Sequence, residues 1–150
     1  WLNILERFYY HFRIYPFAST KIKSLRKPAK MYLWDWSSTP SGPARLENIV
    51  GSHLLKLVHY LYDAFGHKAE LHFLRDVDGR EVDFLVVVDK RPWFAVEVKS
   101  SDRDAALSLR YFGDRLKIPF MYQVVDQAGV DVTQKNIRII SVEKFLSGLV

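Results

Sequence analysis

The chain has 150 residues, of which 49% are apolar, 26% charged and 15% aromatic, and it contains no cysteine. These values suit one globular domain with a sizeable core. They exclude a disordered chain, a disulfide scaffold, a cysteine-ligated zinc site and a thiol nucleophile. The net charge of +5 comes from residues 1–36, which hold seven Lys or Arg and two acidic residues. Such asymmetry is typical of contact with nucleic acid or an acidic partner.

The first residue is Trp1 rather than Met, within an aromatic stretch that has the pattern of a helix. We therefore expect the chain to belong to a longer protein. It has no run of about 18 apolar residues that could span a membrane and no secretory signal pattern, so we expect a cytoplasmic protein without a membrane partner. It also lacks the Gly-x-x-x-x-Gly-Lys-Ser/Thr loop, which predicts no nucleotide site of that kind in this chain.

The N-terminal part predicts a short helix followed by two strands. Apolar residues at helical spacing mark the helix, and strands are expected over 12–17 and 30–34, with a basic loop at 19–30 between them. The run Ser37–Pro43 is polar and rich in turn formers, which indicates a boundary. The predicted organisation is a basic N-terminal extension at 1–36, a linker at 37–44 and a domain at 45–150.

The domain predicts alternating helices and strands. A continuous 3.6-residue period predicts a helix over 45–63, and strands follow at 70–75, 80–88 and 93–99, with Asp78-Gly79 as a hairpin turn. A second helix is expected to open at Ser101, with this serine as its cap. Strands at 120–125 and 136–140 and a helix at 142–149 complete the order. The fold class is therefore α/β, a mixed sheet flanked by helices.

Charged residues gather on two of these strands. Side chains alternate faces along a strand, so Glu81 and Asp83 share a face with Leu85 and Val87, while Glu97 and Lys99 share a face with Ala95. If the strands pair, Asp83 and Glu97 can meet. Carboxylates and a lysine at the ends of apolar strands are costly unless they are solvated, paired or bound to a cation.

Two interpretations of this cluster remain open. In the first, Asp83, Glu97 and the backbone carbonyl of Val98 hold Mg²⁺, which prefers oxygen ligands. Lys99 would then orient or deprotonate a water or stabilise charge on a phosphate, and Glu47 would add a further carboxylate, as in metal-dependent phosphodiester hydrolysis. In the second, the cluster is a structural set of ion pairs. Glu81 is expected to pair with Arg75 or Arg80 rather than to bind metal.

The order of these residues resembles a nuclease pattern. Glu47 on a helix, Asp83 on a second strand and Glu97-Val98-Lys99 on a third are similar to the PD-(D/E)XK nuclease superfamily. Six segments also resemble a domain of unknown function that follows the ATPase module in a family of prokaryotic AAA-type ATP-binding proteins. These segments are Leu5-Glu6, Lys30-Met31-Tyr32-Leu33-Trp34-Asp35, Glu47-Asn48-Ile49-Val50, Leu74-Arg75-Asp76, Gly79-Arg80-Glu81-Val82-Asp83-Phe84 and Val96-Glu97-Val98-Lys99-Ser100-Ser101.

The resemblance implies a restriction-endonuclease-like core of order α-β-β-β-α-β. It implies catalytic roles for Glu47, Asp83, Glu97 and Lys99, with Mg²⁺ or Mn²⁺ as the cofactor. It also implies an upstream ATPase module of the same polypeptide as a partner.

Two hypotheses of function follow. The first is a metal-dependent nuclease acting on DNA. The second is a non-catalytic module of the ATPase, which binds nucleic acid, a protein partner or a second copy of the chain. Four basic residues are candidates for phosphate contact: Lys21, Lys23, Arg26 and Lys27. As alternatives, this segment is a solvated loop or docks on the ATPase module.

Overall fold

The computed structural model describes residues 1–20, 28–100 and 104–149. Its elements, in chain order, are α1 (Leu2–Arg7), β1 (His11–Pro16), β2 (Lys30–Leu33), a 3₁₀ turn η1 (Trp36–Ser38), α2 (Pro43–Phe65), β3 (Ala69–Arg75), β4 (Glu81–Val88), β5 (Arg91–Lys99), α3 (Leu107–Leu116), β6 (Phe120–Val125), β7 (Asp131–Gln134), β8 (Ile137–Ser141) and α4 (Val142–Ser147).

The strands form one mixed sheet in the order β2-β1-β3-β4-β5-β6-β8-β7. β5, β6 and β8 run parallel, while β3, β4 and β5 form an antiparallel meander. β1 joins β3 through a short parallel pairing, and β2 lies outside β1. Residues before and after the predicted linker therefore contribute strands to the same sheet. The fold is mixed α/β, as the sequence predicts, and the order from α2 to β6 is α-β-β-β-α-β.

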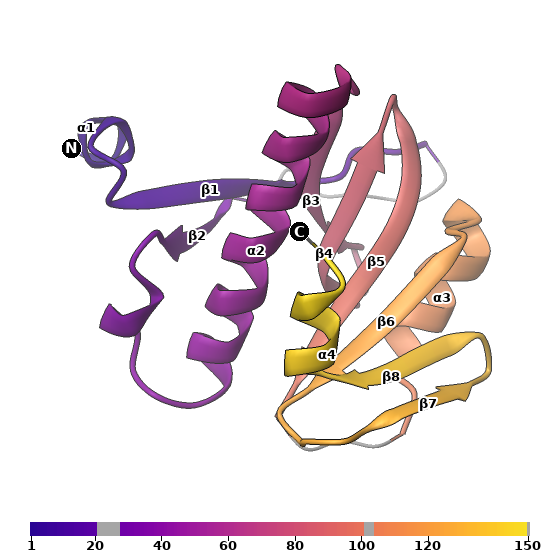
Figure 1. Ribbon diagram of the computed structural model, residues 1–150. Coiled ribbons are helices and arrows are strands. Elements are labelled where there is room, and N and C mark those ends of the chain that lie inside the picture. The colour runs from indigo at the N-terminus through magenta and orange to yellow at the C-terminus, as the bar shows by residue number, and fades with distance from the viewer. Residues whose placement is uncertain (21–27, 101–103, 150) are drawn as a thin grey trace.

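Helices cover both faces of this sheet. Figure 1 shows α2 and α4 on one side, with α3 behind the sheet and α1 standing apart at the end of β1. Each face of the sheet has its own core of buried apolar residues. One core joins Val50 and Leu54 of α2 with Phe145 of α4, and the other contains Leu109 and Phe112 of α3. None of the helices in the described part of the chain is long and apolar enough to cross a membrane.

The local signals explain most of the element boundaries. α2 begins at Pro43, where the missing N–H costs nothing, and ends at Gly66 in a left-handed conformation. The predicted turn at Asp78-Gly79 is present, with Gly79 at a φ of 82°. β7 was not predicted from the sequence, because its hairpin turn lacks glycine. Lys135 and Asn136 both adopt positive φ there, as a two-residue type I′ turn requires.

The start of the second domain helix differs from the prediction. α3 begins at Leu107, with Ala106 at its N-cap and no side-chain cap bond. The predicted cap, Ser101, lies outside the described residues. The side chain of Gln123, buried in β6, accepts from the Ala106 N–H at 2.8 Å and donates to the Asp104 carbonyl at 2.9 Å. These bonds hold residues 104–106 in a non-helical conformation, which sequence periodicity could not reveal.

Candidate functional site

Asp83 and Glu97 lie at the ends of β4 and β5 that face away from their connecting turn. Phe84 pairs with Val96 in the antiparallel ladder, so Asp83 and Glu97 stand opposite each other. The Asp83 carboxylate accepts the Val98 backbone N–H at 2.9 Å. Lys99 Nζ lies 3.3 Å from Glu97 Oε1, and its side chain remains 39% exposed. The structure therefore brings three of the predicted site residues together, and the lysine faces solvent rather than a closed ion pair.

The strict alternation predicted for β4 is wrong between Val82 and Leu85. His72 of β3 pairs with Leu85 and Leu74 pairs with Val82, so β4 holds one extra residue between these two pairings. Val82 and Leu85 consequently pack in the same core beside α3, although they are three residues apart. Such bulges redirect side chains and often occur next to functional sites. Here the Asp83 carboxylate reaches Lys30 on β2.

Glu47 joins the cluster from the first turns of α2. Its Oε1 accepts a hydrogen bond from the Tyr32 hydroxyl at 2.6 Å and lies 3.2 Å from Lys30 Nζ. The next residue, Asn48, is buried and makes a pair of bonds with the backbone of Leu33 at 2.7 and 2.8 Å. These bonds hold α2 against β2 and so place Glu47 close to the other carboxylates.

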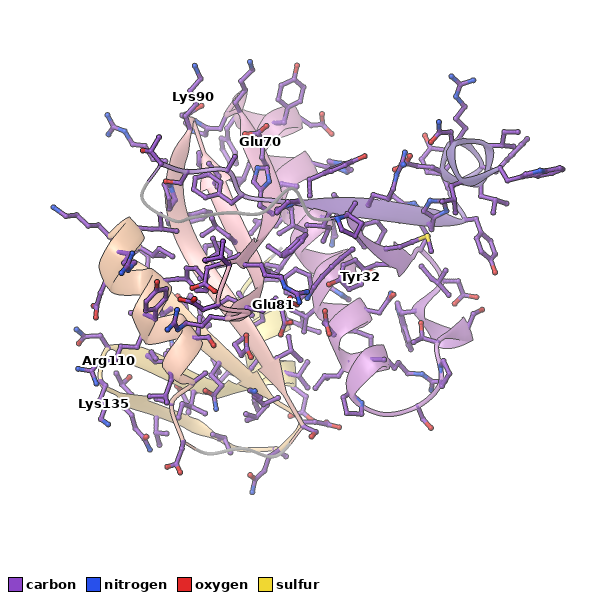
Figure 2. All side chains as sticks on the ribbon, turned by 180° about the vertical axis from the view of Figure 1, so that it is seen from behind. Tyr32, Glu70, Glu81, Lys90, Arg110 and Lys135 are labelled. Atoms are coloured by element: carbon purple, nitrogen blue, oxygen red, sulfur yellow. The ribbon has the colours of Figure 1, made fainter. Side chains whose placement is uncertain are left out.

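Sequence reasoning did not assign Lys30 to the site, although it is central there. Its ammonium lies 2.7 Å from Glu81 Oε1, and 3.2 Å from both Glu47 Oε1 and Asp83 Oδ1. Glu81 also pairs with Arg75 at 3.0 Å, as expected. In Figure 2 the labelled Glu81 and Tyr32 lie near each other in the middle of the molecule. The only sequence signal for Lys30 was its position at the start of a strand in one of the six segments.

The surroundings of the cluster raise the pKa values of both Asp83 and Glu97. Burial, followed by the charge of Glu47, raises the pKa of Asp83. Burial and the charge of Asp83 raise the pKa of Glu97 to about 7. For Lys30, burial alone would lower the pKa, but the surrounding carboxylates outweigh it and raise the pKa. Both carboxyl groups of the Asp83–Glu97 pair are therefore harder to ionise than free carboxyl groups.

A divalent cation suits the donor chemistry of this pair. Glu97 Oε2 is buried and has no hydrogen-bond partner among the residues that the structure describes. An unpaired buried carboxylate oxygen is costly, and carboxylate oxygens are the ligands that Mg²⁺ prefers. As the side chains stand, no three His, Asp or Glu among the described residues are grouped closely enough to hold a metal ion. The Lys30 ammonium occupies the space between Glu47 and Asp83.

A groove of about 450 Å³ opens beside this cluster, between β2 and the start of α2. Lys30, Tyr32 and Glu47 line it, so this side of the cluster is open to solvent. A separate groove of about 560 Å³ lies between β5, β6 and α4. Glu47, Asp83, Glu97, Val98 and Lys99 do not line this second groove. The four basic residues proposed for phosphate contact, Lys21, Lys23, Arg26 and Lys27, lie outside the described residues.

The fold and the cluster define a mixed α/β domain with a partly buried carboxylate–lysine site at one end of its central strands. Residues 44–145 match the family model described as Domain of unknown function (DUF4143), and the chain belongs to this family. The match runs from the start of α2 into α4 and so includes Glu47, Asp83, Glu97 and Lys99. No curated protein and no solved structure matched the chain.

Proposed function

We propose that this domain is a nuclease-like module that hydrolyses DNA phosphodiesters with Mg²⁺ or Mn²⁺ and has a core similar to that of the PD-(D/E)XK nucleases. One observation carries the proposal: Asp83 and Glu97 face each other beside Lys99, and Glu97 Oε2 is buried with no hydrogen-bond partner in the described part of the chain. A buried carboxylate pair of raised pKa beside a solvent-facing lysine is typical of functional sites.

Each side chain has a distinct role in this proposal. Asp83, Glu97 and the Val98 carbonyl would hold the cation, and Glu47 would add a further carboxylate. The cation would supply Lewis-acid polarisation of the phosphate. Lys99 would orient a water molecule or stabilise the charge that develops on the phosphate, because Glu97 holds its ammonium at the solvent edge of the site.

The proposal also includes an ATPase module in the same polypeptide. The six segments that resemble the domain after an AAA-type ATPase module suggest that such a module is a partner within a longer polypeptide. The basic segment that contains Lys21 and Lys27 would then contact DNA phosphates or the ATPase. The neutral charge balance of residues 37–150 means that the charge of the chain is not independent support for nuclease activity.

Cleavage of plasmid and single-stranded DNA in Mg²⁺ or Mn²⁺ tests the proposal. We expect Asp83→Asn and Lys99→Ala each to lower the cleavage rate by about 100-fold or more. Asp63→Ala, an exposed change on α2, is the matched control and should cleave like the wild type. Cleavage that survives both site changes would come from a contaminant and would refute the proposal. Far-UV circular dichroism of each variant verifies that the fold is retained.

A second function is favoured by the position of Lys30. Because its ammonium already lies between Glu47 and Asp83, the cluster can be stable without a metal. The domain would then be a non-catalytic module that binds nucleic acid or a protein partner. In that case DNA retardation should fall steeply with salt, and neutralising Lys21, Lys23, Arg26 and Lys27 should flatten this dependence. No cleavage should be seen in any metal.

A further inference from the structure

Lys30 reaches the site from β2, which precedes the helix and strands that resemble a nuclease core. An ammonium group has three N–H donors, and three carboxylates surround this one at 2.7–3.2 Å: Glu47, Glu81 and Asp83. Its side chain is only 22% exposed, and Nζ also lies 5.5 Å from the centre of the Phe73 ring. Lys30 is therefore held from several sides by separate elements of the fold.

The position of this ammonium matters because two of its partners are proposed to bind a metal. Glu47 Oε1 and Asp83 Oδ1 each lie 3.2 Å from Nζ. A divalent cation that bound both oxygens would have to lie between them, where the ammonium lies now. Two cations at one point repel each other strongly in a partly buried site. Occupation by Lys30 and bridging by a divalent ion are thus mutually exclusive.

We propose that Lys30 is a positioning residue that acts as a tethered cation, competing with divalent metal ions for Glu47 and Asp83 so that its side chain must withdraw before a metal can bridge them. This inference rests on the proposed function, since it takes Asp83 as a metal ligand. In the resting state, Lys30 keeps the three carboxylates together and neutralises part of their charge.

The structure allows this withdrawal without loss of β2. The paired bonds between Asn48 and the Leu33 backbone, at 2.7 and 2.8 Å, hold β2 against α2 independently of Lys30. The ladder with β1 holds its other edge. Only the lysine side chain needs to move, and the groove beside it is open to solvent. The competition is therefore local, and the strand can stay in place.

Calorimetric titration of the whole chain with Mn²⁺ tests the competition. We expect Lys30→Met to bind Mn²⁺ about tenfold or more tightly than the wild type, because a cation is removed from beside the ligands. Lys30→Arg keeps the charge and should show no such gain. Lys56→Met makes the same chemical change at an exposed position of α2 and should bind like the wild type. Equal affinity of Lys30→Met and wild type would overturn the inference.

A second measurement uses the wild-type protein and remains valid if Lys30→Met does not fold. Acetylation of lysines is followed by mass spectrometry with and without saturating Mg²⁺. Lys30 should be protected in the absence of metal and should become several-fold more reactive when metal displaces it, while Lys56 stays constant. Equal protection of Lys30 in both conditions would overturn the inference.

These outcomes separate the inference from the proposed function. If the wild type binds metal and exposes Lys30 but does not cut DNA, the competition holds and the nuclease proposal fails. If Lys30→Met gains a Mn²⁺ site that the wild type lacks, the inference again holds, and the wild-type site is blocked. If neither protein binds Mn²⁺, the inference is wrong.

Discussion

Replacing Tyr32 by Phe removes one hydrogen bond from the site and little else. The Tyr32 hydroxyl donates to Glu47 Oε1 at 2.6 Å. Burial, followed by the charge of Glu47, raises the pKa of Tyr32, so the hydroxyl stays protonated and can donate at any ordinary pH. The ring packs against Phe12 and Phe84 with centroids 5.5 and 5.6 Å away, and phenylalanine keeps these contacts. The change therefore tests the bond to the carboxylate.

The expected loss follows from the type of bond. A hydrogen bond to a charged group contributes about 1.5–3 kcal/mol. Because Glu47 keeps Lys30 as a partner and is 29% exposed, we expect the lower part of this range, about 1.5–2 kcal/mol. For a chain of this length, that loss lowers the melting temperature by about 3–8 °C. Urea unfolding followed by tryptophan fluorescence should show a lower midpoint with an unchanged slope.

Tyr60→Phe is the matched control, since Tyr60 lies on the exposed side of α2 and keeps its ring contact with Phe65. It should leave the free energy of unfolding unchanged within about 0.5 kcal/mol. If Tyr32→Phe were equally neutral, the bond would not hold Glu47 in place. β2 would then not be the element that positions this carboxylate.

Three further changes test the fold around the site by urea unfolding. Gln123→Leu removes both bonds that hold the backbone before α3, and it should lower the free energy of unfolding by about 2–3 kcal/mol. Burial alone would raise the pKa of Asp76, but hydrogen bonds from Arg80 and from two backbone N–H groups outweigh it and lower the pKa. The stability that Asp76 contributes to the folded state is therefore present at pH 7 and is lost as the pH falls below about 4. Asp76→Asn should therefore be less stable than the wild type at pH 7, and the difference should shrink at pH 3. In Gly51→Ala the new Cβ would lie 3.0 Å from the Phe84 ring, so we expect a loss of about 1–2 kcal/mol despite the better helix propensity; a gain in stability would contradict this packing.

Several features of the fold were predictable because they depend on local patterns. The 3.6-residue period of α2 and the apolar runs of β4 and β5 mark elements that bury one or both faces, so their positions follow from residue order alone. Asp83, Glu97 and Lys99 were predicted together because antiparallel neighbours joined by a short turn pair along their length. The exact register was not predictable, since β5 holds one extra residue between the Val87–Pro92 and Val86–Phe94 pairings. The start of α3 was missed because it depends on hydrogen bonds from Gln123, which is distant in sequence. The strand β7 was missed because its turn contains no glycine.

The sequence by itself determined the class of fold, the order of its elements apart from β7, and the three charged residues at the ends of β4 and β5. Only the tertiary structure decided what surrounds them. The extra residue in β4 directs Asp83 toward β2, and the bonds of Asn48 and Tyr32 bring α2 and β2 together there. Lys30 meets Asp83 across 53 positions of sequence. These contacts depend on the place of β2 in the sheet, at the edge beyond β1. Long-range pairing sets the order of the strands, so no local period or spacing in the sequence predicts the contacts.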